Sequence, residues 1–145
     1  MLGGLGPKGE PLPMTPERFA APADRWVVTA QTPKDVAELL DVSRSLYCHG
    51  VFVYEFVTVA VQHALIALEA ALAHRLDRPD DTLGALIKRA HEQGLLTDAD
   101  FEALHTAARP LRNGFGHARH QQVWTVGMAA PVIDRIFATV SALWA

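Results

Sequence analysis

The stretch VFVYEFVTVAVQHALIALEAALAHRL, residues 51–76, predicts a long helix at the centre of a helical domain. Its polar residues Glu55, Gln62 and Glu69 are each seven positions apart. At about 100° per residue they form one narrow polar stripe on an otherwise apolar cylinder. Burying two carboxylates in lipid would be costly, so we interpret the stretch as a buried helix of a soluble bundle. Other helices, or a second copy of the chain, must then cover most of its circumference.

Four further helices are predicted around this one, because apolar residues recur at helical spacing between clear start and stop signals. Three of them are expected to begin after a threonine that caps the first turn, namely Thr32, Thr82 and Thr97. The five predicted helices cover residues 33–47, 51–76, 83–93, 98–115 and 128–144. Neither a strand pattern nor an internal repeat competes with them, so the expected fold class is an all-α bundle.

Residues 1–32 have a different composition and are expected to form a loosely structured arm before the helical domain of residues 33–145. They contain five of the nine prolines and four of the ten glycines, and such an opening cannot hold a helix or supply a core. Within the arm, RWVVTA (residues 25–30) predicts a short extended piece that lies against the bundle, with Trp26 as its anchor.

Length and charge restrict the class of protein. A chain of 145 residues, half of them hydrophobic, suffices for one well-buried core. A net charge of −3 argues against binding nucleic acid by bulk electrostatics, so any such binding must be local. The single cysteine, Cys48, excludes an intramolecular disulfide, and no signal peptide is recognisable, which favours the cytoplasm.

A local basic cluster does exist. The segment LRNGFGHARH, residues 111–120, lies in a stretch without any acidic residue between Glu102 and Asp134. The cationic or titratable side chains of this stretch are His105, Arg109, Arg112, His117, Arg119 and His120. On a helix His105, Arg109 and Arg112 share one face, where paired guanidinium groups can hold a phosphate.

The two glycines of this cluster affect which side chains can meet. On a continuous helix Arg112 and His117 point about 140° apart. Gly114 and Gly116 tolerate backbone conformations that other residues avoid, so the helix can end between them and bring His117 back toward Arg112. Pro110 lacks a backbone donor and favours a kink just before them.

The six residues RNGFGH (112–117) resemble RNxxxH, a common form of the Arg-x4-6-His motif of the HEPN superfamily of small all-helical, often homodimeric domains. The order of a long apolar helix ending ALEAALAHRL, then TLGALIKRAHEQGLL, then the motif helix is also similar to many HEPN-like proteins, over roughly residues 33–145. The resemblance implies a metal-independent endoribonuclease whose composite site forms where two motifs face each other across a dimer.

The resemblance also implies roles for individual residues. Arg112 would hold the scissile phosphate, His117 would act as general base or acid while the ribose 2′-hydroxyl attacks, and Asn113 would orient the backbone or the histidine. The product would be a 2′,3′-cyclic phosphate. Histidine titrates near neutral pH and arginine stays charged, which suits both roles. Additional substrate contacts are expected from Arg109, Arg119, His120 and His105, and Glu55 is expected to support Arg112 as an ion-pair partner.

The expected partners are single-stranded RNA, a second copy of the chain and an antitoxin or other regulatory protein, in a defence or toxin–antitoxin setting, with no membrane, no cofactor and no metal. Some members paired with a nucleotidyltransferase antitoxin carry a tyrosine two residues after the histidine. Here that position is Arg119, which argues against control by modification of such a tyrosine.

Other interpretations of the same residues stay open. Arg112 and Asn113 can simply cap a helix, and His117 can be a satisfied core or surface histidine. The whole domain can be a non-catalytic HEPN-like module that binds RNA, a nucleotide or a protein partner, or a purely structural oligomerisation domain. A zinc site is disfavoured because the neighbouring cations would repel the metal, and Cys48 is expected to be a buried hydrophobe.

Overall fold

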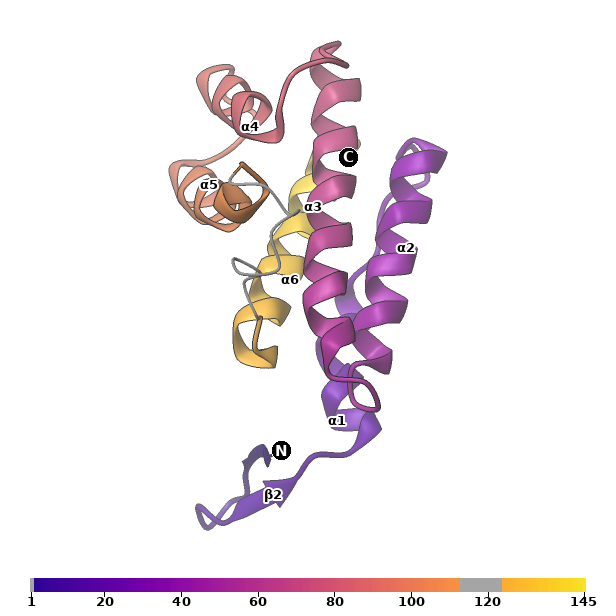
Figure 1. Ribbon diagram of the computed structural model, residues 1–145, viewed down its shortest axis with the longest axis vertical. Helices are drawn as coiled ribbons and strands as arrows, with labels where there is room; N and C mark the ends of the chain where they lie inside the picture. Colours follow the sequence, from indigo (N-terminus) through magenta and orange to yellow (C-terminus); the bar gives the residue numbers. More distant parts are fainter. Residues whose placement is uncertain (1, 113–123) are drawn as a thin grey trace.

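The computed structural model of the chain describes residues 2–112 and 124–145 and shows a mostly helical bundle (Figure 1). The large helices are α2 (Lys34–His49), α3 (Glu55–Leu76), α4 (Leu83–Glu92), α5 (Asp98–Arg112) and α6 (Val126–Leu143). They are preceded by strands β1 (Leu2–Leu5) and β2 (Pro11–Pro13), the short helix α1 (Pro16–Ala20) and the 3-10 helix η1 (Ala21–Arg25). The prediction of an all-α bundle is confirmed.

Helix α3 lies at the centre and packs against α2, α4 and α6 (Figure 1). Its core residues, all at most 1% exposed, are Val57, Ala60, Val61, Ala64, Leu65, Ala67, Leu68, Ala71 and Leu72. By length and composition α3 and α6 would each suffice to cross a membrane, and 50% and 33% of their most apolar windows are buried within the bundle. Apolar helices of this kind are also typical of the cores of soluble helical proteins.

Helices α2 and α3 are antiparallel, and two polar contacts mark their register. The buried Ser43 hydroxyl donates to the Ala60 carbonyl (2.7 Å), and at the other end His74 Nε2 lies 3.0 Å from Asp35 Oδ2. The hydrogen bond with His74 is the main cause that lowers the pKa of Asp35. At the turn between the helices, a Cβ on Gly50 would lie 2.7 Å from the Val57 side chain, so the close approach requires glycine there.

Two predicted helix starts are wrong in detail. Thr32 does not cap α2, because its hydroxyl lies 3.3 Å from the Thr29 hydroxyl. The Thr29 hydroxyl in turn donates to the Trp144 carbonyl. The two threonines thus connect the loop before α2 to the C-terminal end of the chain. Helix α3 begins at Glu55 and not at residue 51, because the chain turns through residues 50–54. The apolar side chains of that turn contribute to the surface, and Phe52 is 73% exposed.

The predicted starts of α4 and α5 are confirmed. Thr82 Oγ1 accepts from the Ala85 amide, and Thr97 Oγ1 accepts from the Asp100 amide. Gly94, with φ of 76°, ends the α4 segment as expected. Thr97 and Asp100, three residues apart, resemble a capping box, but the Asp100 carboxylate accepts from Arg135 Nη1 (2.7 Å) and links α5 to α6.

The prediction of a loose arm without a helix is wrong for the second half of residues 1–32. Thr15 caps α1, and Phe19 and Trp26 are 1% and 2% exposed in the core. Trp26 is the predicted anchor: its ring packs edge-on against Tyr47 and stacks on Phe137. Within the described part of the N-terminal segment, β1 and β2 extend away from the bundle as a small antiparallel hairpin (Figure 1).

Candidate functional site

Helix α5 carries the predicted basic residues toward the end where the RNGFGH motif begins. Its backbone is described to Arg112, through Pro110, and the side chain of Arg109 is exposed. The structure does not describe the side chain of Arg112. Asn113, His117, Arg119 and His120 lie outside the described residues, together with Gly114 and Gly116. Of the predicted phosphate-binding side chains, Arg109 and His105 can therefore be located.

His105 is less accessible than the helix periodicity predicts. Its ring stacks on Phe101 (centroids 5.3 Å apart), and Phe101 also stacks on His91 (centroids 4.4 Å apart). His91 is held in turn by Asp98 through a 2.7 Å contact. His105 Nδ1 is enclosed and has no hydrogen-bond partner among the described residues. His105 thus takes part in the contact between α4 and α5 through Phe101, and a role in binding substrate stays a prediction.

A hydrogen bond between Trp124 and Thr58 fixes the chain that follows the motif to α3. The Trp124 amide donates to Thr58 Oγ1 (3.1 Å), and the Trp124 side chain is 6% exposed. Thr58 lies one turn after Glu55, which is exposed in the first turn of α3. The described residues that flank the motif segment therefore lie at the end of α5 and beside Thr58, one turn from Glu55. Whether Glu55 pairs with Arg112, as expected, lies outside what the described residues show.

Between α5 and α6 the surface contains a groove of about 590 Å³. It is lined by Ala99, Glu102, Ala103, Thr106, Ala107, Trp124, Gly127, Met128, Pro131 and Val132. Most of these side chains are apolar, and the polar groups are the Glu102 carboxylate and the Thr106 hydroxyl. Because Trp124 lines the groove, the groove reaches the first described residue after the motif segment.

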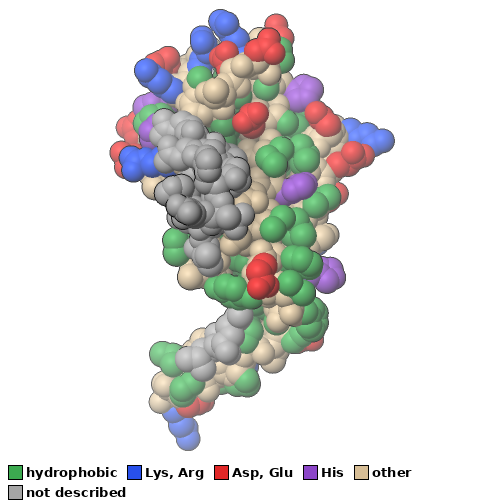
Figure 2. Space-filling model, viewed as in Figure 1, with side chains coloured by type: hydrophobic (Ala, Val, Ile, Leu, Met, Phe, Trp, Pro, Cys, Tyr) green, Lys and Arg blue, Asp and Glu red, His purple; other side chains and the backbone are tan. Residues whose placement is uncertain are grey.

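The other notable surface is an apolar face over α2 and α3, which we call the α2–α3 face. Figure 2 shows hydrophobic and histidine side chains gathered there. Its large exposed apolar residues are Val42, Val53, Val59 and Ile66, which are 40–46% exposed. The predicted polar stripe of Glu55, Gln62 and Glu69 runs along α3 beside Val59 and Ile66, so the exposed side of this helix is mixed and not purely polar.

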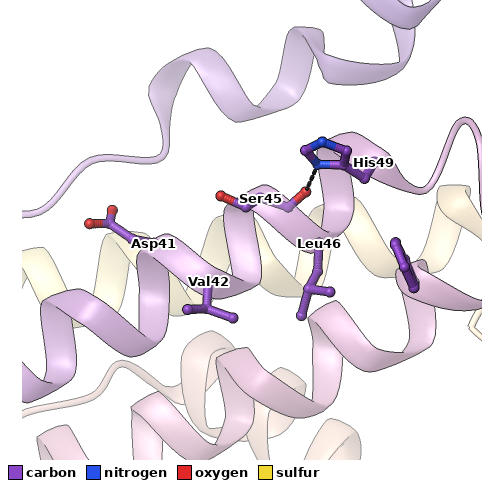
Figure 3. A pocket seen from close by; sticks show the side chains of 6 residues that line it. Asp41, Val42, Ser45, Leu46 and His49 are labelled. Atoms are coloured by element: carbon purple, nitrogen blue, oxygen red, sulfur yellow. Dashed lines mark hydrogen bonds between the residues drawn. The ribbon is translucent and has the colours of Figure 1, made fainter.

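A hollow of about 300 Å³ opens on the α2–α3 face and is lined by Leu46 and Phe56; Figure 3 shows it from close by. Asp41, Val42, Ser45 and His49 complete its lining. The His49 ring Nδ1 lies 2.7 Å from the Ser45 carbonyl, so Nδ1 carries the proton that it donates there. The lining is mostly apolar, which suits contact with another apolar surface better than binding of a charged ligand.

The surroundings of Cys48 and of the described histidines favour neither a reactive thiol nor a metal site. Burial is the main cause that raises the pKa of the Cys48 thiol, which disfavours the reactive thiolate. Burial likewise raises the pKa of Tyr47 to about 12. Within residues 2–112 and 124–145 no three His, Cys, Asp or Glu side chains gather in a metal-binding group.

Sequence reasoning missed three features of this region: Thr58, Trp124 and the α5–α6 groove. Thr58 and Trp124 are 66 residues apart, and neither belongs to a motif. The only signal in the sequence was the position of Trp124 just before the last helix. The groove depends on how α5 and α6 pack, which no local pattern specifies.

Comparison with known proteins identifies no relative of this chain. No protein-family model, no curated protein and no solved structure matches this chain. The observations that bear on function are therefore the RNGFGH motif and the surfaces of the described residues around it.

Proposed function

We propose that this protein is a metal-independent endoribonuclease of the HEPN type that cleaves single-stranded RNA in a site shared by two copies of the chain. The observation that carries the proposal is the RNGFGH motif within a 31-residue stretch without acidic residues, directly after α5 of a helical bundle. The exposed Arg109, one turn before Arg112, supports it by extending the cationic surface along α5.

In this proposal Arg112 holds the scissile phosphate through paired N–H donors and stabilises the charge that develops on the phosphorane. His117 accepts the proton of the ribose 2′-hydroxyl, whose oxygen attacks the adjacent phosphorus. The bond from phosphorus to the 5′-oxygen breaks, and a protonated group, supplied by either copy of the motif, protonates that oxygen. The products are a 2′,3′-cyclic phosphate and a 5′-hydroxyl end.

The first experiment is incubation of the purified protein with 5′-labelled single-stranded RNA in EDTA, followed by analysis of the product ends. We expect cleavage that persists in EDTA and fragments that end in a cyclic phosphate. Cleavage that requires a divalent cation, or products with 3′-hydroxyl ends, would contradict the proposed mechanism. Salt-dependent RNA binding without cleavage would instead favour a non-catalytic RNA-binding module.

The proposed dimer uses the α2–α3 face. A second copy of the chain can bury the exposed valines and Ile66 by packing its own α2–α3 face against this one. The face lies beside Thr58, which binds the Trp124 amide just after the motif segment, so we expect a two-fold axis through α3 to bring two motif segments toward each other.

Ile66→Glu places a charge in the middle of this face and should convert the dimer to a monomer, because the buried carboxylates of two copies would be unpaired. Sedimentation equilibrium measures the change, and RNA cleavage should fall in parallel if the site is composite. Val27→Glu is the matched control, since Val27 is 68% exposed outside α2 and α3. A dimeric Ile66→Glu protein would show that the interface lies elsewhere.

A further inference from the structure

The α5–α6 groove combines apolar walls with a polar edge, which is the character of a site for a flat, partly polar ring. Ala103 and Val132 form part of its walls, and Met128, at 45% exposed, offers a flexible apolar side chain. Its volume of about 590 Å³ is within the range of small-molecule sites.

The polar edge has a defined order along α5. Glu102, Thr106 and Arg109 are four and three residues apart, and all three are exposed. Residues at this spacing share one side of a helix, so a carboxylate, a hydroxyl and a guanidinium follow one another over about 10 Å toward the motif. The negative group lies at the groove, and the positive group lies nearer the end of α5.

This order matches the charge distribution of a nucleotide. A phosphate is attracted to Arg109 and repelled by Glu102, whereas a base that carries N–H donors is a suitable partner for the carboxylate. Glu102 takes part in none of the ion pairs between described residues, so no such pair competes with a ligand for its oxygens. Single-stranded RNA is commonly read in this way, by hydrogen bonds to the Watson–Crick edge of an unstacked base.

The arrangement of donors distinguishes the four bases. Guanine presents two adjacent donors, N1–H and the N2 amino group, which match the two oxygens of a carboxylate. Cytosine and adenine each place a bare ring nitrogen beside their amino group, and that lone pair is repelled by a carboxylate. Uracil has one N–H between two carbonyl oxygens, which are likewise repelled. A carboxylate therefore favours guanine over the other three bases.

We propose that the α5–α6 groove is a guanine-binding subsite, in which the Glu102 carboxylate accepts from N1–H and N2–H while the ring lies against Ala103 and Met128. Arg109 contacts the phosphate of the same nucleotide. The subsite rests on the proposed function as a ribonuclease: it sets the base preference near the scissile bond.

Binding of the four nucleoside 5′-monophosphates to the wild-type protein, measured by calorimetry, tests the subsite without requiring cleavage. We expect GMP to bind about tenfold or more tightly than AMP, CMP or UMP, since a good bidentate pair discriminates by this order. Glu102→Gln replaces one acceptor by a donor and should abolish the preference. Glu92→Gln, an exposed carboxylate at the end of α4, is the matched control and should retain it.

A second variant tests the location. Ala103→Leu fills part of the groove and should weaken binding of GMP, whereas its half-buried position on the helix surface makes folding tolerant of the larger side chain. Equal binding of all four nucleotides, or GMP binding that survives both Glu102→Gln and Ala103→Leu, would overturn the subsite. RNA cleavage by wild-type protein in the same preparation would show that the ribonuclease proposal stands without it. GMP binding without any cleavage would overturn the ribonuclease proposal and retain the subsite.

Discussion

His117→Ala should lower the rate of RNA cleavage by about 10²–10⁴-fold, the contribution typical of a positioned general acid or base. The alanine cannot take the proton from the 2′-hydroxyl, whereas RNA binding through the arginines should persist. Single-turnover cleavage of a labelled RNA by wild type and variant measures the ratio, and the melting temperature of each protein shows whether the variant is folded. A folded variant with unchanged cleavage would contradict the role of His117.

Variants of Arg112, and of a histidine outside the motif, make this test specific. Arg112→Ala should cause a similar loss, and Arg112→Lys should recover only part of it, because lysine keeps the charge but loses the two parallel donors. His74→Ala is the control, since His74 is a half-exposed histidine whose contact is with Asp35 at the far end of α3. If Arg112→Ala lowers only thermal stability, Arg112 has the alternative role of holding the end of α5.

The predicted helices agree with the structure where the signals are local. Thr82 and Thr97 cap helices because a hydroxyl three residues before an amide depends only on the backbone of one turn. Thr32 has the same local signal, but its hydroxyl has another partner in Thr29. A tertiary contact therefore outweighs the capping preference there, and no neighbouring residue in the sequence announces it.

In the candidate site, too, local sequence signals identify single residues but not the tertiary contacts between them. The motif residues Arg112 and His117 could be named from the sequence because their chemistry and spacing are local. The contact between Thr58 and Trp124 joins α3 to the chain just before α6, 66 residues later in the sequence, so no local pattern contains it. In the sequence Glu102 is only the boundary of the acid-free stretch, because its place at the groove depends on how α6 packs beside α5.

The N-terminal segment was the largest error in the expected fold, and it also gives the largest expected effect on stability. Trp26→Ala should lower the free energy of unfolding by about 3–5 kcal/mol, as for other buried tryptophan or phenylalanine truncations. Trp26 is 2% exposed, and the centroid of its ring lies 4.9 Å from that of Tyr47 and 5.7 Å from that of Phe137. Removal of the ring therefore leaves a cavity between η1, α2 and α6. Denaturation by urea, followed by circular dichroism, measures the change.

Two further variants separate packing from hydrogen bonding at this position. Trp26 Nε1 donates to Asp134 Oδ1 (3.1 Å), which also accepts from Arg25 (2.6 Å). Trp26→Phe keeps most of the apolar ring but removes this donor, and it should cost clearly less than Trp26→Ala, because Arg25 still satisfies the carboxylate. Val27→Ala changes a neighbouring side chain that is 68% exposed and should alter stability by no more than about 0.5 kcal/mol. If Trp26→Ala were as mild as Val27→Ala, residues 15–32 would not be part of the core, and the expectation of a loose arm would be the better description of this segment.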